Sequence, residues 1–217
     1  MSEVTEDAFD FGRTRLETLT DGIFAIAMTV LVLTLKPPDL PDSATNQQVM
    51  DTLAKMVPNF IAFVASFFTL GMFWATHHAA FRYLTRTDRV IVWLNMSFLL
   101  MVSIVPFTTG LYAGDVDNTI VNTVFGANLI LMGLLNYAMW AHARARGYVY
   151  KEISEEARHF STRRILTAPA IAAIAMVASM IQPRFAEVIY FSMVPLFMVT
   201  VKPFALPWAK KGGNISK

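Results

Sequence analysis

Six apolar segments, each about 20 residues long, recur along this chain of 217 residues. A helix needs about 20 apolar residues to cross a bilayer, so each segment is long enough to span one. The segments run approximately over Leu16–Lys36, Val57–Thr76, Val90–Leu111, Ile120–Ala143, Ile165–Ile181 and Val188–Trp208. This pattern predicts an all-α membrane protein with six transmembrane helices in one domain covering residues 1–217.

The composition agrees with a membrane protein. Hydrophobic residues make up 55% of the chain and charged residues only 16%, whereas a soluble domain carries about 25% charged residues. The first residues, up to Gly12, are acidic and lack a basic start and an apolar run, so we expect no cleavable signal peptide. The chain has no cysteine, which excludes disulfides and thiolate metal sites.

The basic residues are divided unequally between the two ends of the six segments. Of the 18 Lys and Arg residues, only Lys36, Lys55 and Arg184 fall on the side of the first, third and fifth connections. All others share a side with the N-terminus, the second and fourth connections and the C-terminus. Positive charge favours the cytoplasmic side, so we expect both termini in the cytoplasm and a multi-pass protein of the cell (plasma) membrane. The basic stretch 144–164 would contact anionic lipid or simply carry loop charge.

Two charged residues lie at the start of the first segment, Arg15 and Asp21. Charge is costly at membrane depth, so both should have partners or a purpose. One interpretation makes Arg15 a snorkelling interfacial charge and Asp21 a first-turn residue favoured by the helix dipole. Another places them in a buried polar network with Trp74, His77 and Asn95, whose side chains can hydrogen-bond to a carboxylate.

The order of residues in this first segment follows a distinctive pattern. Arg15 is followed by three residues, then Leu19-Thr20-Asp21, then an apolar helix that contains Ala25-Ile26 and Thr29. The pattern resembles the signature of the transmembrane protein 175 family of potassium channels, which has Arg, three residues, Phe-Ser-Asp, and an apolar helix with Ala-Ile and Thr. Leu19 stands where the family has an aromatic residue and Thr20 where it has serine; an apolar group and a hydroxyl are retained.

The resemblance continues through the next two segments. Its further motifs are Trp74-Ala75-Thr76-His77-His78, similar to the family's Trp-x-x-His-His, then Arg86-Thr87-Asp88, Trp93-Leu94-Asn95 and Pro106-Phe107. Several motifs in order at family spacing are more specific than one motif alone. Beyond Phe107 the resemblance rests on the number of helices.

The resemblance implies a passive, potassium-preferring cation channel. K⁺ would be the permeant ion, and the first helix would line the central pore of a homotetramer without a carbonyl filter loop. The family's constriction corresponds here to Ile26, Thr29, Val30 and Leu33. These four residues fall at i, i+3, i+4 and i+7, on one helix stripe, a spacing that by itself favours ordinary packing between helices.

The side chains of this stripe suggest how such a constriction would work. Rings of Ile26, Val30 and Leu33 would form a hydrophobic gate, because a narrow apolar neck excludes water. The Thr29 hydroxyl would contact a partly dehydrated cation or bond back to its own helix. The other segments carry no Asp or Glu in their cores, so we expect only modest selectivity for K⁺ over Na⁺.

The resemblance also favours the polar network over the interfacial interpretation. Its members would be Arg15, Thr20, Asp21, Trp74, His77 and Asn95, and its role would be structural: to hold the first helix against the second and third. Asp21 would lie about 140° from Ile26 around the helix and face the bundle rather than the pore.

Other functions remain open from the residues alone. The main alternative is a secondary ion transporter or a proton-leak pathway, although transporters usually show repeats, broken helices or intramembrane carboxylates. A membrane protein that transports nothing is also open. No Ser-His-Asp or HExxH pattern indicates an enzyme. His77 and His78 point about 100° apart on a helix, so we expect no metal site; we also expect no cofactor and no nucleic-acid partner.

Overall fold

The computed structural model describes residues 12–150 and 155–200, and its regular elements in these ranges are helices. They are α1 (Arg13–Val30), the 3₁₀ helix η2 (Leu31–Thr34), α2 (Asn46–Phe81), α3 (Arg89–Gly114), α4 (Thr119–Ala145), α5 (Glu155–Ile181) and α6 (Pro183–Thr200). The predicted all-α membrane fold is confirmed. Within the described ranges, five stretches are long and apolar enough to cross a membrane, from Arg13–Thr34 to Ser161–Ile181. The last predicted span runs past Thr200, so part of it lies outside the described residues.

Polar side chains set where three of the helices begin. Thr45 and Gln48 form a capping box: the Gln48 N–H donates to Thr45 Oγ1 over 3.3 Å and the Thr45 N–H donates to Gln48 Oε1 over 2.9 Å. Asp88 caps α3 by accepting from the Ile91 N–H over 2.9 Å, and Asn118 caps α4. Such caps satisfy backbone donors that the first turn of a helix leaves free. The cap at Thr45 explains why α2 begins well before Val57, the residue where the apolar segment starts.

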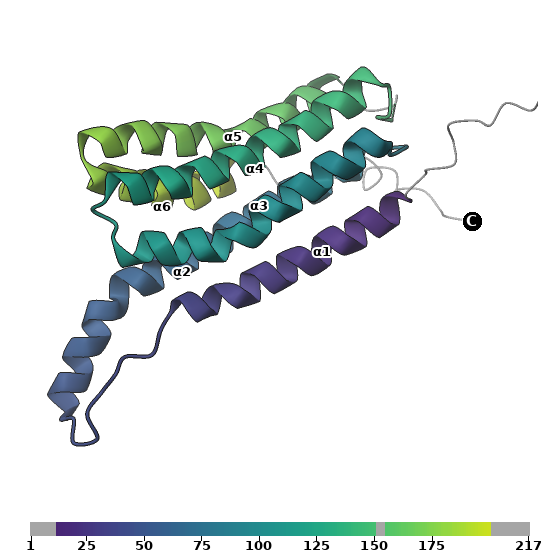
Figure 1. Ribbon diagram of the computed structural model, residues 1–217. Coiled ribbons are helices and arrows are strands. Elements are labelled where there is room, and N and C mark those ends of the chain that lie inside the picture. The colour runs from purple at the N-terminus through teal and green to yellow at the C-terminus, as the bar shows by residue number, and fades with distance from the viewer. Residues whose placement is uncertain (1–11, 151–154, 201–217) are drawn as a thin grey trace, which may run out of the picture.

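The helices α2 to α6 pack together, and α1 lies along one side of them against α2 and α3 (Figure 1). The linker after η2 and the first turns of α2 extend beyond the end of this bundle. Consequently one face of α1 packs against the rest of the chain, and the opposite face is not covered by any of the described residues.

The α4–α5 contact depends on small residues. A Cβ atom added at Gly133 would lie 2.5 Å from Cγ of Pro169, and one added at Gly126 would meet the Tyr190 hydroxyl and Ala172. Glycine lets two helix backbones approach closely, which is a common way for helices to associate in membranes.

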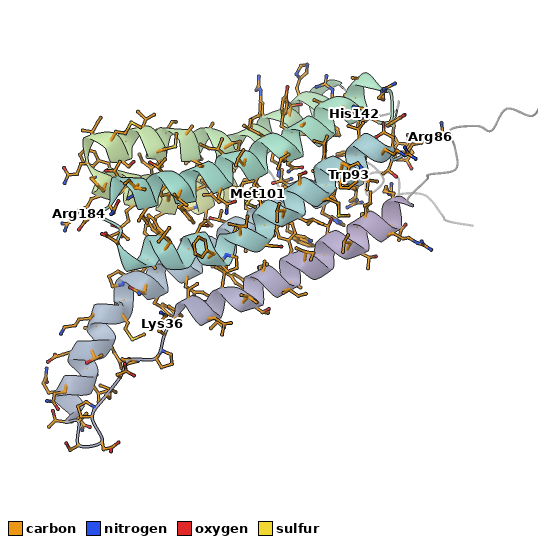
Figure 2. All side chains as sticks on the ribbon, in the orientation of Figure 1. Lys36, Arg86, Trp93, Met101, His142 and Arg184 are labelled. Carbon is orange, nitrogen blue, oxygen red and sulfur yellow. The ribbon has the colours of Figure 1, made fainter. Side chains whose placement is uncertain are left out.

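At one end of the bundle, the turn after α4 pairs with the α2–α3 loop. The α4 helix ends at Ala145 and is followed by Gly147, whose φ is 71°. The N–H of Tyr148 donates to the Ala143 carbonyl over 2.9 Å, as in a Schellman motif. The Tyr148 carbonyl accepts from the Thr85 N–H over 2.7 Å, and this contact joins the α4 end to the α2–α3 loop. Figure 2 shows Arg86 and His142 near this end, with Lys36 and Arg184 at the opposite end, in keeping with the charge division in the sequence.

Candidate functional site

The two faces of α1 differ sharply in exposure. One stripe is buried against α2 and α3 and consists of Leu16, Thr20, Phe24, Ala27 and, in η2, Leu31, all at most 4% exposed. The spacing of three and four residues places these side chains on one side of a helix. The opposite side is open, with Ile26 61% and Leu33 72% exposed.

The four residues of the predicted constriction all lie on this open side. Ile26, Thr29, Val30 and Leu33 are exposed in the single subunit, although Val30 is covered to a greater extent than its neighbours, at 38% exposure. Leu33 belongs to η2, where the chain tightens to about three residues per turn. We call Ile26, Thr29, Val30 and Leu33 the open face of α1.

Thr29 supplies the hydroxyl of the open face. Its Oγ1 donates to the carbonyl oxygen of Ile26 over 2.8 Å and lies 3.1 Å from that of Ala25. The bond back to the helix foreseen from the sequence is therefore present. Because the hydroxyl proton is used within the helix, the lone pairs of Oγ1 remain for an outside partner, and only a donor or a cation can use them.

Behind the open face, three polar side chains form a buried chain of hydrogen bonds that links α1, α2 and α3. Thr20, His77 and Asn95 are each at most 1% exposed. His77 Nε2 lies 2.9 Å from Asn95 Oδ1, and Asn95 Nδ2 donates to Thr20 Oγ1 over 3.3 Å. The pairing with an amide oxygen assigns the hydrogen to Nε2 of His77.

Aromatic rings enclose this buried triad. The His77 ring stacks on Phe81 at 4.1 Å between centroids and on Phe98 at 5.2 Å. Phe98 in turn lies 5.8 Å from Phe24 of α1. The triad is thus shielded from water, and each of its hydrogen bonds is costly to break.

Asp21 and Trp74 form a separate contact nearer the surface. Trp74 Nε1 donates to Asp21 Oδ1 over 2.7 Å, and the Trp74 side chain is 39% exposed. The ring of Trp74 also stacks on His78 at 5.6 Å. This pair joins α1 to α2 at the edge of their contact.

The structure therefore differs in two respects from the single buried network expected from the sequence. The network divides into the buried triad and the surface pair, and Arg15 belongs to neither. Within residues 12–150 and 155–200 the Arg15 side chain has no hydrogen bond or ion pair. Asp21 follows Arg15 by six residues, which rotate an α-helix by one full turn and about 240° more. The two side chains therefore leave the helix in different directions.

Arg13, which the sequence analysis did not select, takes the anchoring position instead. Its guanidinium Nη1 donates to the Leu84 carbonyl over 2.8 Å, and its Nε lies 3.7 Å from Glu17. The bond ties the start of α1 to the α2–α3 loop. No residue pattern marks this contact, because it depends on where a loop distant in sequence folds back.

A second pair missed in the sequence is Asp88 with His142, whose Nε2 lies 2.7 Å from Asp88 Oδ2. Burial alone would raise the pKa of the Asp88 carboxyl, but hydrogen bonds from His142 and the Ile91 N–H outweigh burial and lower that pKa below its ordinary value. Asp88 before an apolar helix is a recognisable cap signal. Its pairing with His142, 54 positions away, is not readable from sequence.

The histidines at the end of α2 do not converge on a common point. His77 is in the core and His78 stacks on Trp74. In the part of the chain that the structure describes, no three His, Cys, Asp or Glu side chains are grouped as metal ligands would be.

Comparisons of the sequence and of the fold with known proteins both find similarity to potassium channels of one family. A family model described as the endosomal/lysosomal potassium channel TMEM175 matches residues 15–106. The chain is 31% identical over 140 residues to a potassium channel of Streptomyces collinus, a match that covers 63% of this chain and 66% of that one, just under two thirds of the relative's length. It is 31% identical over 97 residues to the endosomal/lysosomal proton channel TMEM175 of Gallus gallus, covering 42% of this chain and 19% of that protein.

A solved structure extends the likeness beyond the matched N-terminal half. The crystal structure of a lysosomal potassium-selective channel TMEM175 homolog from Chamaesiphon minutus aligns with a TM-score of 0.75 and 26% identity, covering 86% of this chain and 96% of that one. The later helices, where the sequence resemblance rested only on helix number, therefore also follow this fold.

Proposed function

Because the chain belongs to the TMEM175 family, whose model matches its residues 15–106, we propose that it is a potassium-preferring cation channel that conducts passively. The observation that carries this proposal is the open face of α1: an apolar stripe with one hydroxyl, uncovered in the single subunit, on a helix whose other side is buried. The named function of the Streptomyces relative supports K⁺ as the permeant ion.

The pore proposed here is formed between subunits. In a homotetramer in the plasma membrane, four copies of α1 turn their open faces toward a common axis and Ile26, Val30 and Leu33 form the hydrophobic gate. Water leaves a narrow apolar neck readily, so widening of the neck would switch conduction on. The open faces would then be covered by water and by one another, which accounts for their exposure in one subunit.

Selectivity in this proposal rests on Thr29 and on the width of the neck. The hydroxyl proton of Thr29 is engaged by the Ile26 carbonyl, so four Oγ1 atoms around an axis present lone pairs to a cation. A ring of four neutral oxygens replaces only part of a hydration shell. We therefore expect a preference for K⁺ over Na⁺ that is modest rather than steep.

The buried triad and the surface pair act as supports in this proposal. Thr20 of α1 accepts from Asn95 Nδ2 over 3.3 Å, and Asn95 is itself held by His77 at 2.9 Å, so the triad would fix the rotation of α1 about its axis. Asp21 and Trp74 add a contact at the edge. Each ring of the gate takes one side chain from each of four helices. Consecutive residues lie about 100° apart around a helix, so a small rotation of α1 would turn the gate residues away from the axis.

Reconstitution of the purified protein in liposomes tests the function. With a K⁺ gradient and no other driving ion, a channel gives electrogenic K⁺ flux and single-channel steps in bilayers. A secondary transporter instead gives saturable flux that depends on a second ion, and that result would contradict the proposal. Native mass spectrometry of the same sample checks the stoichiometry, with four chains expected.

Proton permeation is the second candidate, because the Gallus relative is named a proton channel. A pH-sensitive dye inside the same liposomes separates the two. If the lumen acidifies under a proton gradient while no K⁺ current is found, proton conduction is the function and the proposal for K⁺ is wrong.

A further inference from the structure

A small, partly open cavity lies between α2, α3, α4 and α6, on the far side of α2 and α3 from the open face of α1. It is lined by Ser66 and Thr69 of α2, Tyr112 of α3, Leu129 of α4 and Tyr190 of α6, among others. Within the cavity, the centre of a water-sized sphere can occupy a volume of about 10 Å³. A volume of about 10–15 Å³ measured in this way holds one water molecule.

The Tyr112 hydroxyl is the unusual group in this cavity. The residue is 3% exposed, and its oxygen, fully covered, has no hydrogen-bond partner among the residues that the structure describes. Tyr190, which lies edge-on to Tyr112 with centroids 5.8 Å apart, donates to the Asn122 carbonyl over 3.1 Å. An unpaired buried hydroxyl destabilises the fold, so proteins rarely retain one.

Two further hydroxyls of the lining have bonding capacity left. Ser66 Oγ accepts from Thr109 Oγ1 over 3.0 Å, which uses one of its two lone pairs. Thr69 makes no hydrogen bond with the described part of the chain. A buried water molecule needs two to four polar partners, and the lining supplies the hydroxyl groups of Tyr112, Ser66 and Thr69 in addition to that of Tyr190.

We propose that this cavity is a binding site for one water molecule, held between the hydroxyl groups of Tyr112, Ser66 and Thr69. The water accepts a hydrogen bond from the Tyr112 hydroxyl and donates one hydrogen bond each to the oxygens of Ser66 and Thr69. It thereby adds a bridge between α2 and α3 beside the direct Thr109–Ser66 bond.

The bridge lies at a point that matters for the end of α1. A Cβ atom added at Gly110 of α3 would lie 3.5 Å from Thr34 Cγ2 of η2, so η2 packs on α3 within one turn of Tyr112. A water that fixes α3 to α2 at this level steadies the surface on which η2 lies. This site does not depend on the proposed conduction through the open face.

The sign of a stability change tests the proposal. In the full-length protein in detergent, Tyr112→Phe removes the hydroxyl and loses its bond to water, so the melting temperature should fall by about 2–4 °C. Tyr190→Phe is the matched control, because it removes a hydroxyl with a known protein partner from the same cavity and should lower the melting temperature similarly. If Tyr112→Phe leaves the melting temperature unchanged or raises it while Tyr190→Phe lowers it, the hydroxyl is unpaired and the proposal is overturned.

A density map gives a second measurement that needs no variant. At a resolution that shows ordered water, we expect a peak within hydrogen-bonding distance of the Tyr112 hydroxyl oxygen and of Ser66 or Thr69. A map that shows other buried waters but no peak in this cavity overturns the proposal, even where Tyr112→Phe fails to fold.

Discussion

At the scale of single residues, the Thr29 hydroxyl decides what the open face of α1 offers to a cation. Apolar side chains set the width of the neck and exclude water, but they offer no oxygen atom to an ion. The Thr29 hydroxyl donates its hydrogen bond to the Ile26 carbonyl. The lone pairs of Thr29 Oγ1 stay available, and oxygen lone pairs are the type of ligand that binds K⁺. The distinction between K⁺ and Na⁺ is thus expected to depend on Thr29 more than on its neighbours.

The variant Thr29→Val tests this role. Valine keeps the shape but has no oxygen, so we expect the K⁺-to-Na⁺ permeability ratio to fall by about two- to tenfold, the equivalent of one net hydrogen bond. Reversal potentials in bilayers under K⁺ and Na⁺ gradients measure the ratio. Thr18→Val is the matched control, since Thr18 is also exposed on α1 and bonds back to Thr14. An unchanged ratio in Thr29→Val would assign selectivity to neck width alone.

The buried triad and the surface pair should differ in their contributions to stability. Asn95→Leu leaves the hydrogen on His77 Nε2 without an acceptor in the core, and we expect a loss of about 1–3 kcal/mol in the free energy of unfolding. Trp74→Phe breaks a contact that is partly exposed and should cost less. Thermal unfolding of both variants in detergent gives the order. A larger loss for Trp74→Phe would show that the surface pair is the main support of α1.

Sequence reasoning selected the right residue types for the support of α1 but not their grouping. Thr20, His77 and Asn95 could be expected to meet because their motifs resemble a family pattern. Their separation from Asp21 depends on burial, which the pattern does not give. Arg15 was included on its charge, whereas the helix rotation between Arg15 and Asp21 excludes a shared contact.

At the scale of the elements, close approach of helices explains the cohesion of the bundle better than hydrophobicity does. Lipid tails are as apolar as leucine, so helices in a membrane gain from packing rather than from escape from water. Gly133 and Pro169 meet at such a contact between α4 and α5.

Substitution of Gly133 should therefore be costly. In Gly133→Ala the new methyl group would lie 2.5 Å from Pro169, closer than carbon atoms can approach, so the helices must separate. We expect a loss of about 1–3 kcal/mol in the free energy of unfolding. Gly114→Ala is the control, because nothing lies within 4 Å of its added Cβ. Equal melting temperatures for the two variants would contradict the close contact.

The helices themselves were largely predictable from apolar runs, but their limits were not. The α2 helix begins at Asn46 because of the Thr45–Gln48 cap, although the residues just after the cap are too polar to count as a span. The first helix tightens to a 3₁₀ turn at Leu31, which no periodicity in the sequence marks. The residues at which a helix begins and ends depend on single hydrogen bonds, and a run of apolar residues does not indicate where these bonds form.

At the scale of the whole molecule, the Asp88–His142 contact joins the start of α3 to the end of α4 and gives stability a dependence on pH. The pKa of Asp88 is lowered in the folded protein from its ordinary 3.8. A group of this kind stabilises the fold above its unfolded pKa, and this contribution is lost as the pH falls through the lower folded value.

The variant Asp88→Asn isolates that charge, because asparagine also caps helices well. Near neutral pH we expect the wild-type protein to melt at a higher temperature than Asp88→Asn. The difference should shrink as the pH falls below 3.8, where the wild-type carboxyl becomes protonated. Melting curves over a pH series measure it. A difference that stays constant into this acidic range would show that the charge of Asp88 does not stabilise the fold.

The central claim concerns which exposed surface of the subunit meets water, because α3 also carries exposed apolar residues. Trp93 and Phe107 are 72% and 69% exposed, as much as Ile26 at 61% and Leu33 at 72%. Both faces are exposed in one subunit, so the proposal distinguishes them by the correspondence of the open face of α1 to the family's constriction. The proposal assigns water to the open face of α1 and lipid or a neighbouring subunit to α3.

Cysteine accessibility tests this assignment most directly, since the natural chain has no cysteine. We would introduce Ile26→Cys on α1 and Phe107→Cys on α3, and treat channels in liposomes with a water-soluble, thiol-reactive cation while recording K⁺ flux. The account predicts that the reagent blocks flux in Ile26→Cys and leaves Phe107→Cys unaffected. Block of Phe107→Cys, with unaltered flux through Ile26→Cys, would contradict it.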